Sequence, residues 1–228
     1  MEGNKLNKHR PFHLYDGHTY FLTGRCYKAV NYFYNDERKE MFQKVLKESI
    51  ERFDIKLFSW VLLDNHYHIL FSIYVPDEFL SVQFVNPNKD EISKSKSCYS
   101  NKNYPNKDER NDEMSSNEFR QTLQKKKIIE FVRKLHKDTA RFINKIDKTP
   151  GRQIWYQYFD YCLRNKADFW KHFNYIIKNP FKHGLVKSLE EAFHYKYSSN
   201  PVWLKRFGVE GINESFIKYS VEEVFLKD

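Results

Sequence analysis

Residues 62–71 have the sequence LLDNHYHILF, in which two histidines alternate with other residues inside an apolar run. Alternate residues of a β-strand share one face of a sheet, so His66 and His68 are expected to project to the same side. Neutral imidazole is the commonest protein ligand of divalent metals, and the pair is therefore a candidate metal site. The alternative is two histidines satisfied by hydrogen bonds at a strand end, and the pair alone leaves both interpretations open.

The residues around the histidines predict an antiparallel hairpin. Residues 55–63 form an apolar run typical of a strand, and Asp64 and Asn65 suit a tight turn into the next strand. His66 and His68 then lie close to the turn of this hairpin.

Two further elements are expected before the hairpin. The β-branched and aromatic run over residues 19–26 predicts a first strand, with Arg25 near the end of the sheet. Asn35 or Asp36 can cap a helix that extends to about Arg52, because apolar residues recur there at helical spacing.

The composition of the chain changes after the hairpin. Residues 76–117 are rich in Asn, Lys, Ser, Asp and Glu, which indicates an inserted, mobile surface loop. Residues 118–148 have the periodicity of a long helix with one apolar side and one basic side. A basic side is usually only solvated, but beside a nucleic-acid site it would contact phosphates, and the candidates are Arg133, Lys134 and Arg141.

Aromatic residues dominate the segment after the long helix. Residues 153–164 predict a strand pair or an extended arm. Asn165 is expected to cap a helix over residues 166–179, which Pro180 is expected to terminate. A C-terminal tail over residues 201–228 could cover the core or fold back over a functional site as a lid, and we expect it to cover the core.

Tyr175 and Asn179 are the polar pair of interest in that helix. They are one helical turn apart, so the phenol and the amide project from one face. In a chain with 16 tyrosines, a tyrosine that simply packs against Phe173 or Phe181 is the plainer interpretation.

Composition favours an anionic partner. The formal net charge is +9, the pI is about 9.2 and 18% of residues are aromatic, which provides charge for phosphates and flat surfaces for bases. A biased genome can produce similar usage. Three widely separated cysteines argue against a disulfide framework and a Cys-based zinc site, and we expect a reducing, cytoplasmic setting. No apolar stretch has the length of a membrane span, and the 228 residues are expected to form one domain.

The order of these segments resembles a known family. The histidine pair in residues 62–71, the aromatic block over 155–164 and the stretch YIIKNPFKHGLV over 175–186 are similar to the REP-associated tyrosine transposases. These transposases are single-tyrosine HUH endonucleases. The similarity spans roughly residues 12–75 and 118–200.

The resemblance implies an α+β, ferredoxin-like core, in which an antiparallel sheet has helices packed on one face. It implies action on single-stranded DNA with hairpin (REP-like) ends, with Tyr175 as the catalytic nucleophile. His66 and His68 would hold a divalent metal, Mg²⁺ or Mn²⁺, with Asn179 as a third ligand. A monomer and a homodimer both remain open.

The implied chemistry is nicking and strand transfer. Attack by Tyr175 on a backbone phosphate would give a 5′-phosphotyrosine and a free 3′-hydroxyl, and another 3′-hydroxyl could reverse the step. Lys182 and His183 are expected to contact DNA or to pack near the site, and Arg25 is a further candidate for DNA binding.

Two departures and two alternatives accompany the resemblance. The insertion over residues 76–117 is longer than the connection usual in the family. Asp64 stands where the family often has proline, and it either orients a histidine or belongs to the turn. A captured transposase that binds nucleic acid without turnover is the first alternative. The second is a metal-dependent phosphodiesterase that activates water in place of Tyr175.

Overall fold

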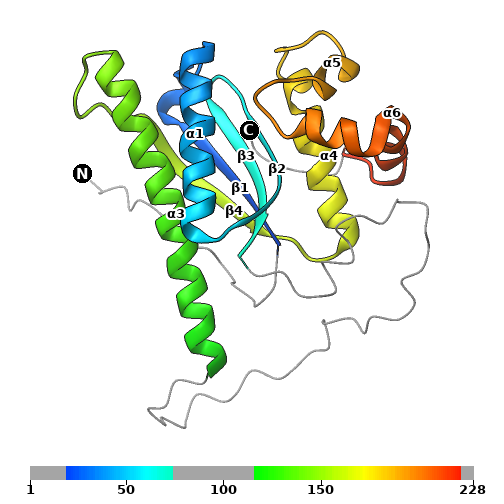
Figure 1. The fold of residues 1–228 in the computed structure, drawn as a ribbon, viewed down its shortest axis with the longest axis horizontal. Coiled ribbons are helices and arrows are strands. Elements are labelled where there is room, and N and C mark those ends of the chain that lie inside the picture. Colours follow the sequence, from blue (N-terminus) through cyan, green and yellow to red (C-terminus); the bar gives the residue numbers. More distant parts are fainter. Residues whose placement is uncertain (1–18, 74–115, 222–228) are drawn as a thin grey trace, which may run out of the picture.

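The computed structural model describes residues 19–73 and 116–221, with side chains of the second range described from residue 126 (Figure 1). The expected insertion over 76–117 therefore lies almost entirely outside the described residues. Among the described residues, no helix combines the length and the apolar character that crossing a membrane requires. The elements are β1 (Thr19–Cys26), η1 (Tyr27–Ala29), α1 (Asp36–Phe53), β2 (Lys56–Leu62), β3 (His66–Ser72), α3 (Ser116–Ile146), β4 (Trp155–Cys162), α4 (Lys166–Lys182), α5 (Leu189–Phe193) and α6 (Asn200–Lys218).

The strands form one four-stranded antiparallel sheet in the order β2-β3-β1-β4. With α1 after β1 and α3 between β3 and β4, this is the ferredoxin-like arrangement that was predicted. β2 and β3 form the expected hairpin, in which the Leu63 N–H donates to the His66 carbonyl at 2.8 Å. The aromatic segment forms one strand, β4, at an edge of the sheet, and not a strand pair.

Helices cover both faces of the sheet. α1 and α3 lie side by side on one face, where they bury alternate strand residues such as Leu22, Tyr67 and Ile69 (Figure 1). This layer is the one the ferredoxin-like prediction expected. α4 and α6 cover the other face and bury Phe21 and Leu70. The second layer was not predicted, and it forms because both sides of β1 and β3 are apolar.

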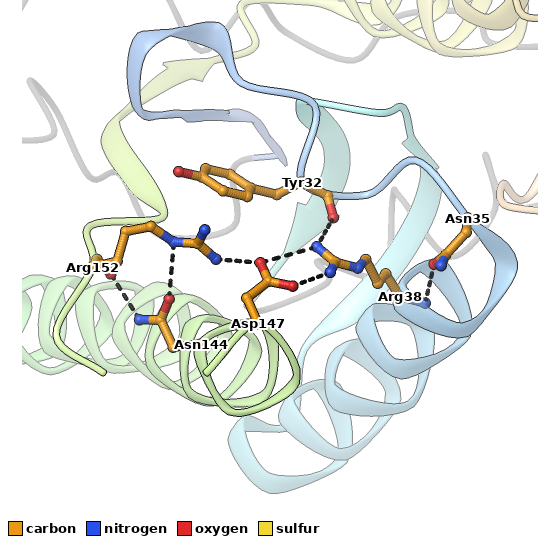
Figure 2. Close-up of polar contacts among 6 residues, drawn as sticks. All are labelled: Tyr32, Asn35, Arg38, Asn144, Asp147 and Arg152. Atoms are coloured by element: carbon orange, nitrogen blue, oxygen red, sulfur yellow. Dashed lines mark hydrogen bonds and ion pairs between the residues drawn. The ribbon is translucent and has the colours of Figure 1, made fainter. Parts of the chain in front are cut away.

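A network of polar side chains joins the start of α1 to the end of α3 (Figure 2). Arg38, which is only 3% exposed, donates to the Tyr32 carbonyl at 3.1 Å and forms an ion pair with Asp147. Arg152 pairs with the same carboxylate and donates through Nε to the Asn144 side chain at 3.2 Å. The shared carboxylate fixes the ends of the two helices relative to each other.

Gly24 permits the close approach of β1 and β3. A Cβ at Gly24 would lie 2.3 Å from Cε1 of Tyr67, which is the partner residue in the register. Tyr67 is fully buried, and its hydroxyl lies 2.8 Å from Nε2 of His136, whose ring stacks on Trp155 at 4.6 Å. The ring of Tyr67 therefore packs directly over Gly24 and holds β3 close to β1. It does so on the face of the sheet opposite to the two histidines.

Helix α4 begins as predicted and ends later. Asn165 caps it by accepting a hydrogen bond from the Asp168 N–H at 2.9 Å. The prediction that Pro180 terminates the helix was wrong, because α4 continues to Lys182 with Pro180 inside it. Proline removes one N–H donor, but the His183 N–H still donates to the Asn179 carbonyl at 3.1 Å. Burial of the last turns of α4 stabilises the helix by more than the missing hydrogen bond costs.

Most of the C-terminal residues that were expected to be a tail form helix α6. Trp203 donates from its indole to the Phe58 carbonyl at 3.0 Å, and its ring lies 5.1 Å from that of Phe173. The buried side chain of Asn200 donates to the Ile177 carbonyl at 3.1 Å and to the Ala192 carbonyl at 2.8 Å. These contacts join α6 and α5 to α4, and residues 222–228 lie outside the described range.

Candidate active site

The two histidines are the first and third residues of strand β3, and their rings face α4. Their rings lie 5.1 Å apart, and His66 is 3% exposed while His68 is fully buried. Arg25 is the register partner of His66, and Thr23 is the register partner of His68. The strand pairing therefore positions both imidazoles and Arg25 at one end of the sheet.

Helix α4 brings Tyr175 and Asn179 to the same place. The ring of Tyr175 meets that of His68 edge to face at 5.2 Å, and Phe21 contacts both rings. Tyr175 is 4% exposed and Asn179, one turn further on, is fully buried. A strand and a helix that are distant in sequence thus place these side chains in one buried region.

Several polar atoms of this region have no hydrogen-bond partner within the protein. They include Nε2 of His68 and both side-chain polar atoms of Asn179, and all three are buried. A buried polar group without a partner costs about 1–3 kcal/mol. An imidazole nitrogen and an amide oxygen are suitable donors for a divalent cation, so these residues fit a metal site. The described residues contain no cluster of three or more His, Cys, Asp or Glu residues suited to a metal.

The remaining ring nitrogens are held by neighbouring side chains. Nδ1 of His68 lies 2.8 Å from the Thr23 hydroxyl, and Nδ1 of His66 lies 2.7 Å from Oδ1 of Asn65. Such contacts commonly orient histidines that bind metals. The sequence did not identify Thr23 or Asn65 as part of the site, although Asn65 precedes the first histidine.

Burial lowers the pKa of His68 well below the usual value, and the nearby His66, His183, Lys182 and Arg25 lower it further. His68 is therefore neutral at neutral pH. A neutral ring is the form that can bind a metal ion.

Lys182 and His183 both lie at the site. Nζ of Lys182 donates to the Tyr175 hydroxyl at 3.0 Å and lies 4.9 Å from the centre of its ring. The ring of His183 lies 4.7 Å from that of His66. Sequence reasoning connected Lys182 with DNA and missed its contact with Tyr175. The sequence feature that could have indicated this contact is the position of Lys182, two turns after Tyr175 on the same face of the helix.

The same face of α4 continues toward its N-terminus with His172 and Asp168, which sequence reasoning also missed. Nδ1 of His172 lies 2.8 Å from the Asp168 carbonyl and 3.3 Å from its carboxylate. The His172 ring packs on Phe21 at 4.8 Å. Phe21 therefore separates this pair from the ring of His68.

The basic residues of α3 lie elsewhere. Arg133, Lys134 and Arg141 belong to the helix that covers the opposite face of the sheet, so the fold does not bring them together with the histidines. Lys134 forms an ion pair with Asp138 at 2.6 Å. Of the predicted cations, Arg25 and Lys182 do lie at the site.

Asp64 is directed to a lysine and not to a histidine. Its carboxylate lies 2.7 Å from Nζ of the buried Lys39, which also donates to the Tyr195 hydroxyl at 3.2 Å. Of the two interpretations of Asp64, these contacts match a residue of the turn and not one that orients a histidine.

The similarity of this chain to known proteins lies in its fold. No protein-family model matches the chain, and no curated protein matches it in sequence. A solved structure of a REP-associated tyrosine transposase bound to a REP hairpin has a similar fold, with a TM-score of 0.52. The two chains are 17% identical, and the similarity covers 88% of this chain and 87% of the other. At this identity the similarity shows a shared fold.

Proposed function

We propose that this protein is a DNA transposase that cleaves and rejoins single-stranded DNA with hairpin ends through a covalent bond to Tyr175. The observation that carries the proposal is the convergence of Tyr175, His66, His68 and Asn179 from β3 and α4 in one buried region. The structural neighbour is itself a tyrosine transposase bound to a hairpin, which supports the choice of substrate class.

Tyr175 supplies the nucleophile. Its hydroxyl oxygen attacks the phosphorus of a backbone phosphate and forms a new P–O bond, while the bond from phosphorus to the 3′ oxygen breaks. The phenol proton leaves to solvent, and the departing 3′ oxygen takes up a proton to become a hydroxyl. The phosphate stays on Tyr175 as a 5′-phosphotyrosine, and a 3′-hydroxyl from another strand can attack it to join new ends.

Lys182 acts on the same oxygen. Its ammonium donates a hydrogen bond to the Tyr175 hydroxyl and orients it, and the positive charge stabilises the oxygen when it leaves in the rejoining step. Lys182 is exposed, so the nucleophile lies just below the surface that DNA would approach.

His66, His68 and Asn179 would hold a divalent ion, which we propose to be Mg²⁺ or Mn²⁺. When bound, the ion would withdraw charge from a phosphate oxygen and make the phosphorus more electrophilic. The nitrogen ligands also suit zinc, but an amide ligand at a phosphoryl-transfer site suits Mg²⁺ or Mn²⁺ at least as well.

DNA would be held by charge. Arg25 and His183 lie beside the histidines and are proposed to contact the strand near the cleaved phosphate. Arg133, Lys134 and Arg141 are proposed as phosphate contacts remote from the site, on the other face of the sheet.

The test is the formation of a covalent adduct. The protein is incubated with Mg²⁺ or Mn²⁺ and single-stranded hairpin oligonucleotides from its own genomic neighbourhood, and adducts that resist denaturation are mapped to a residue. We expect an adduct on Tyr175 that Tyr175→Phe and His66→Ala abolish and that Tyr156→Phe, a change at a half-exposed tyrosine of β4, retains. Cleavage without an adduct would instead indicate activation of water. Binding without cleavage across a well-sampled hairpin set would indicate a binding module.

A further inference from the structure

Asn65, in the turn between β2 and β3, makes three polar contacts, one through its backbone and two through its side chain. Its carbonyl accepts a hydrogen bond from the Cys26 N–H at 2.7 Å, and its Nδ2 donates to the Ala29 carbonyl at 3.1 Å. Its Oδ1 lies 2.7 Å from Nδ1 of His66. The side chain therefore bridges the segment after β1 and the first histidine of β3.

These contacts determine where the proton of His66 lies. The Ala29 carbonyl can only accept, so the amide must present its nitrogen to Ala29 and its oxygen to His66. An amide oxygen also can only accept, so Nδ1 of His66 must carry a proton. A neutral imidazole has one donor and one acceptor nitrogen, and the lone pair of His66 is then on Nε2.

The backbone around Ala29 is shaped for this contact. Lys28 and Ala29 both adopt positive φ, at 54° and 53°, a conformation that residues other than glycine rarely adopt. That turn presents the Ala29 carbonyl to Asn65. A disfavoured conformation that is kept beside a candidate site is consistent with a functional role.

The second histidine has no comparable determinant. Nδ1 of His68 meets the Thr23 hydroxyl at 2.8 Å, and a hydroxyl can donate or accept. Thr23 therefore accommodates either tautomer of His68. Asn65 and Thr23 occupy similar places beside the two rings, but only Asn65 dictates a protonation site.

We propose that Asn65 is a positioning residue that holds neutral His66 in the Nδ1–H tautomer, so that Nε2 is the nitrogen that binds a metal. The consequence for metal binding rests on the function proposed above, but the tautomer itself does not. Residues that orient a metal-binding histidine typically contribute a factor of about 10–100 in metal affinity.

The first experiment measures the tautomer in the metal-free, full-length protein by ¹⁵N NMR of labelled histidine at about pH 8, where histidine is ordinarily neutral. His66→Gln identifies the His66 signals among those of the 9 histidines. We expect a protonated Nδ1 in the wild type and substantial protonation of Nε2 in Asn65→Ala. Asn65→Asp keeps an acceptor next to Nδ1 and should retain the wild-type tautomer, and Thr23→Val should leave His66 unchanged.

The second experiment measures the affinity of the same variants for Mn²⁺ by calorimetry. We expect Asn65→Ala to bind Mn²⁺ about 10–100-fold more weakly and Asn65→Asp to recover most of that loss. A wild-type His66 protonated on Nε2, or an Asn65→Ala variant with an unchanged tautomer, would overturn the proposal. The predicted tautomers together with no Mn²⁺ binding by the wild type would support the role of Asn65 and would count against the metal site.

Discussion

Gly24→Ala is expected to destabilise the protein and to disturb the site from the opposite face of the sheet. The new Cβ would lie 2.3, 2.4 and 2.6 Å from three atoms of the Tyr67 side chain, so the ring must move by about 1 Å to reach ordinary contact. The ring is enclosed by Phe42 at 5.2 Å and Trp155 at 5.3 Å, and it has little room to move. Overpacking a core costs about 1–3 kcal/mol. Losing the 2.8 Å bond to His136 leaves two buried polar groups unpaired, which adds about 1–3 kcal/mol.

The expected loss in the free energy of unfolding is therefore about 2–6 kcal/mol, which urea denaturation of wild type and variant would measure. Because Tyr67 lies between His66 and His68 on β3, Mn²⁺ affinity should fall as well. A double-mutant cycle with Tyr67→Leu supplies the control, since a smaller side chain at position 67 should make Gly24→Ala far less costly. If Gly24→Ala cost less than about 1 kcal/mol, or cost the same in the Tyr67→Leu background, the steric reasoning would be refuted.

Three further predictions concern other parts of the molecule. Asp147→Asn should cost roughly 2–4 kcal/mol at pH 7, because it leaves the buried Arg38 without its carboxylate. Burial alone would raise the pKa of Asp147, but hydrogen bonds from Arg152 and Arg38 lower it below its ordinary value. The contribution of Asp147 is thus present above about pH 4 and is lost as the pH falls through the lowered pKa, so urea denaturation should show wild type and variant converging in acid. Lys182→Met should slow cleavage about 100-fold without weakening Mn²⁺ binding, whereas Lys178→Met on the same helix should cleave normally; equal rates for both would refute the role of Lys182. Asn200→Ala should cost about 2–3 kcal/mol, because the Ile177 and Ala192 carbonyls lose a buried donor, and hydrogen exchange should show α6 opening first.

Features that depend on nearby residues were predictable from the sequence. Alternation placed His66 and His68 on one face of a strand, and helical spacing placed Tyr175 and Asn179 on one face of α4. The cap at Asn165 also follows a local rule, because its side chain accepts from an N–H three residues later.

Features that depend on contacts between distant residues were not predictable in the same way. Whether the basic side of α3 reaches the histidines is decided by which face of the sheet α3 covers. Asp64 could have oriented a histidine, and only the fold shows that Lys39 takes its carboxylate. The helix passes Pro180 because packing of its last turns offsets a local penalty. Rules based on neighbouring residues do not include the free energy of contacts between residues that are distant in sequence.

The free energy of the site bears on the choice between a structural and a functional histidine pair. A purely structural pair should have its polar atoms satisfied within the protein, as Nδ1 of His68 is by Thr23. Nε2 of His68 and both polar atoms of Asn179 have no such partner, although all three are buried. A buried polar group that stays without a partner costs about 1–3 kcal/mol. The proposed site would give these groups their partners on binding, with a cation at the imidazole nitrogen and the amide oxygen and a phosphate at the amide nitrogen.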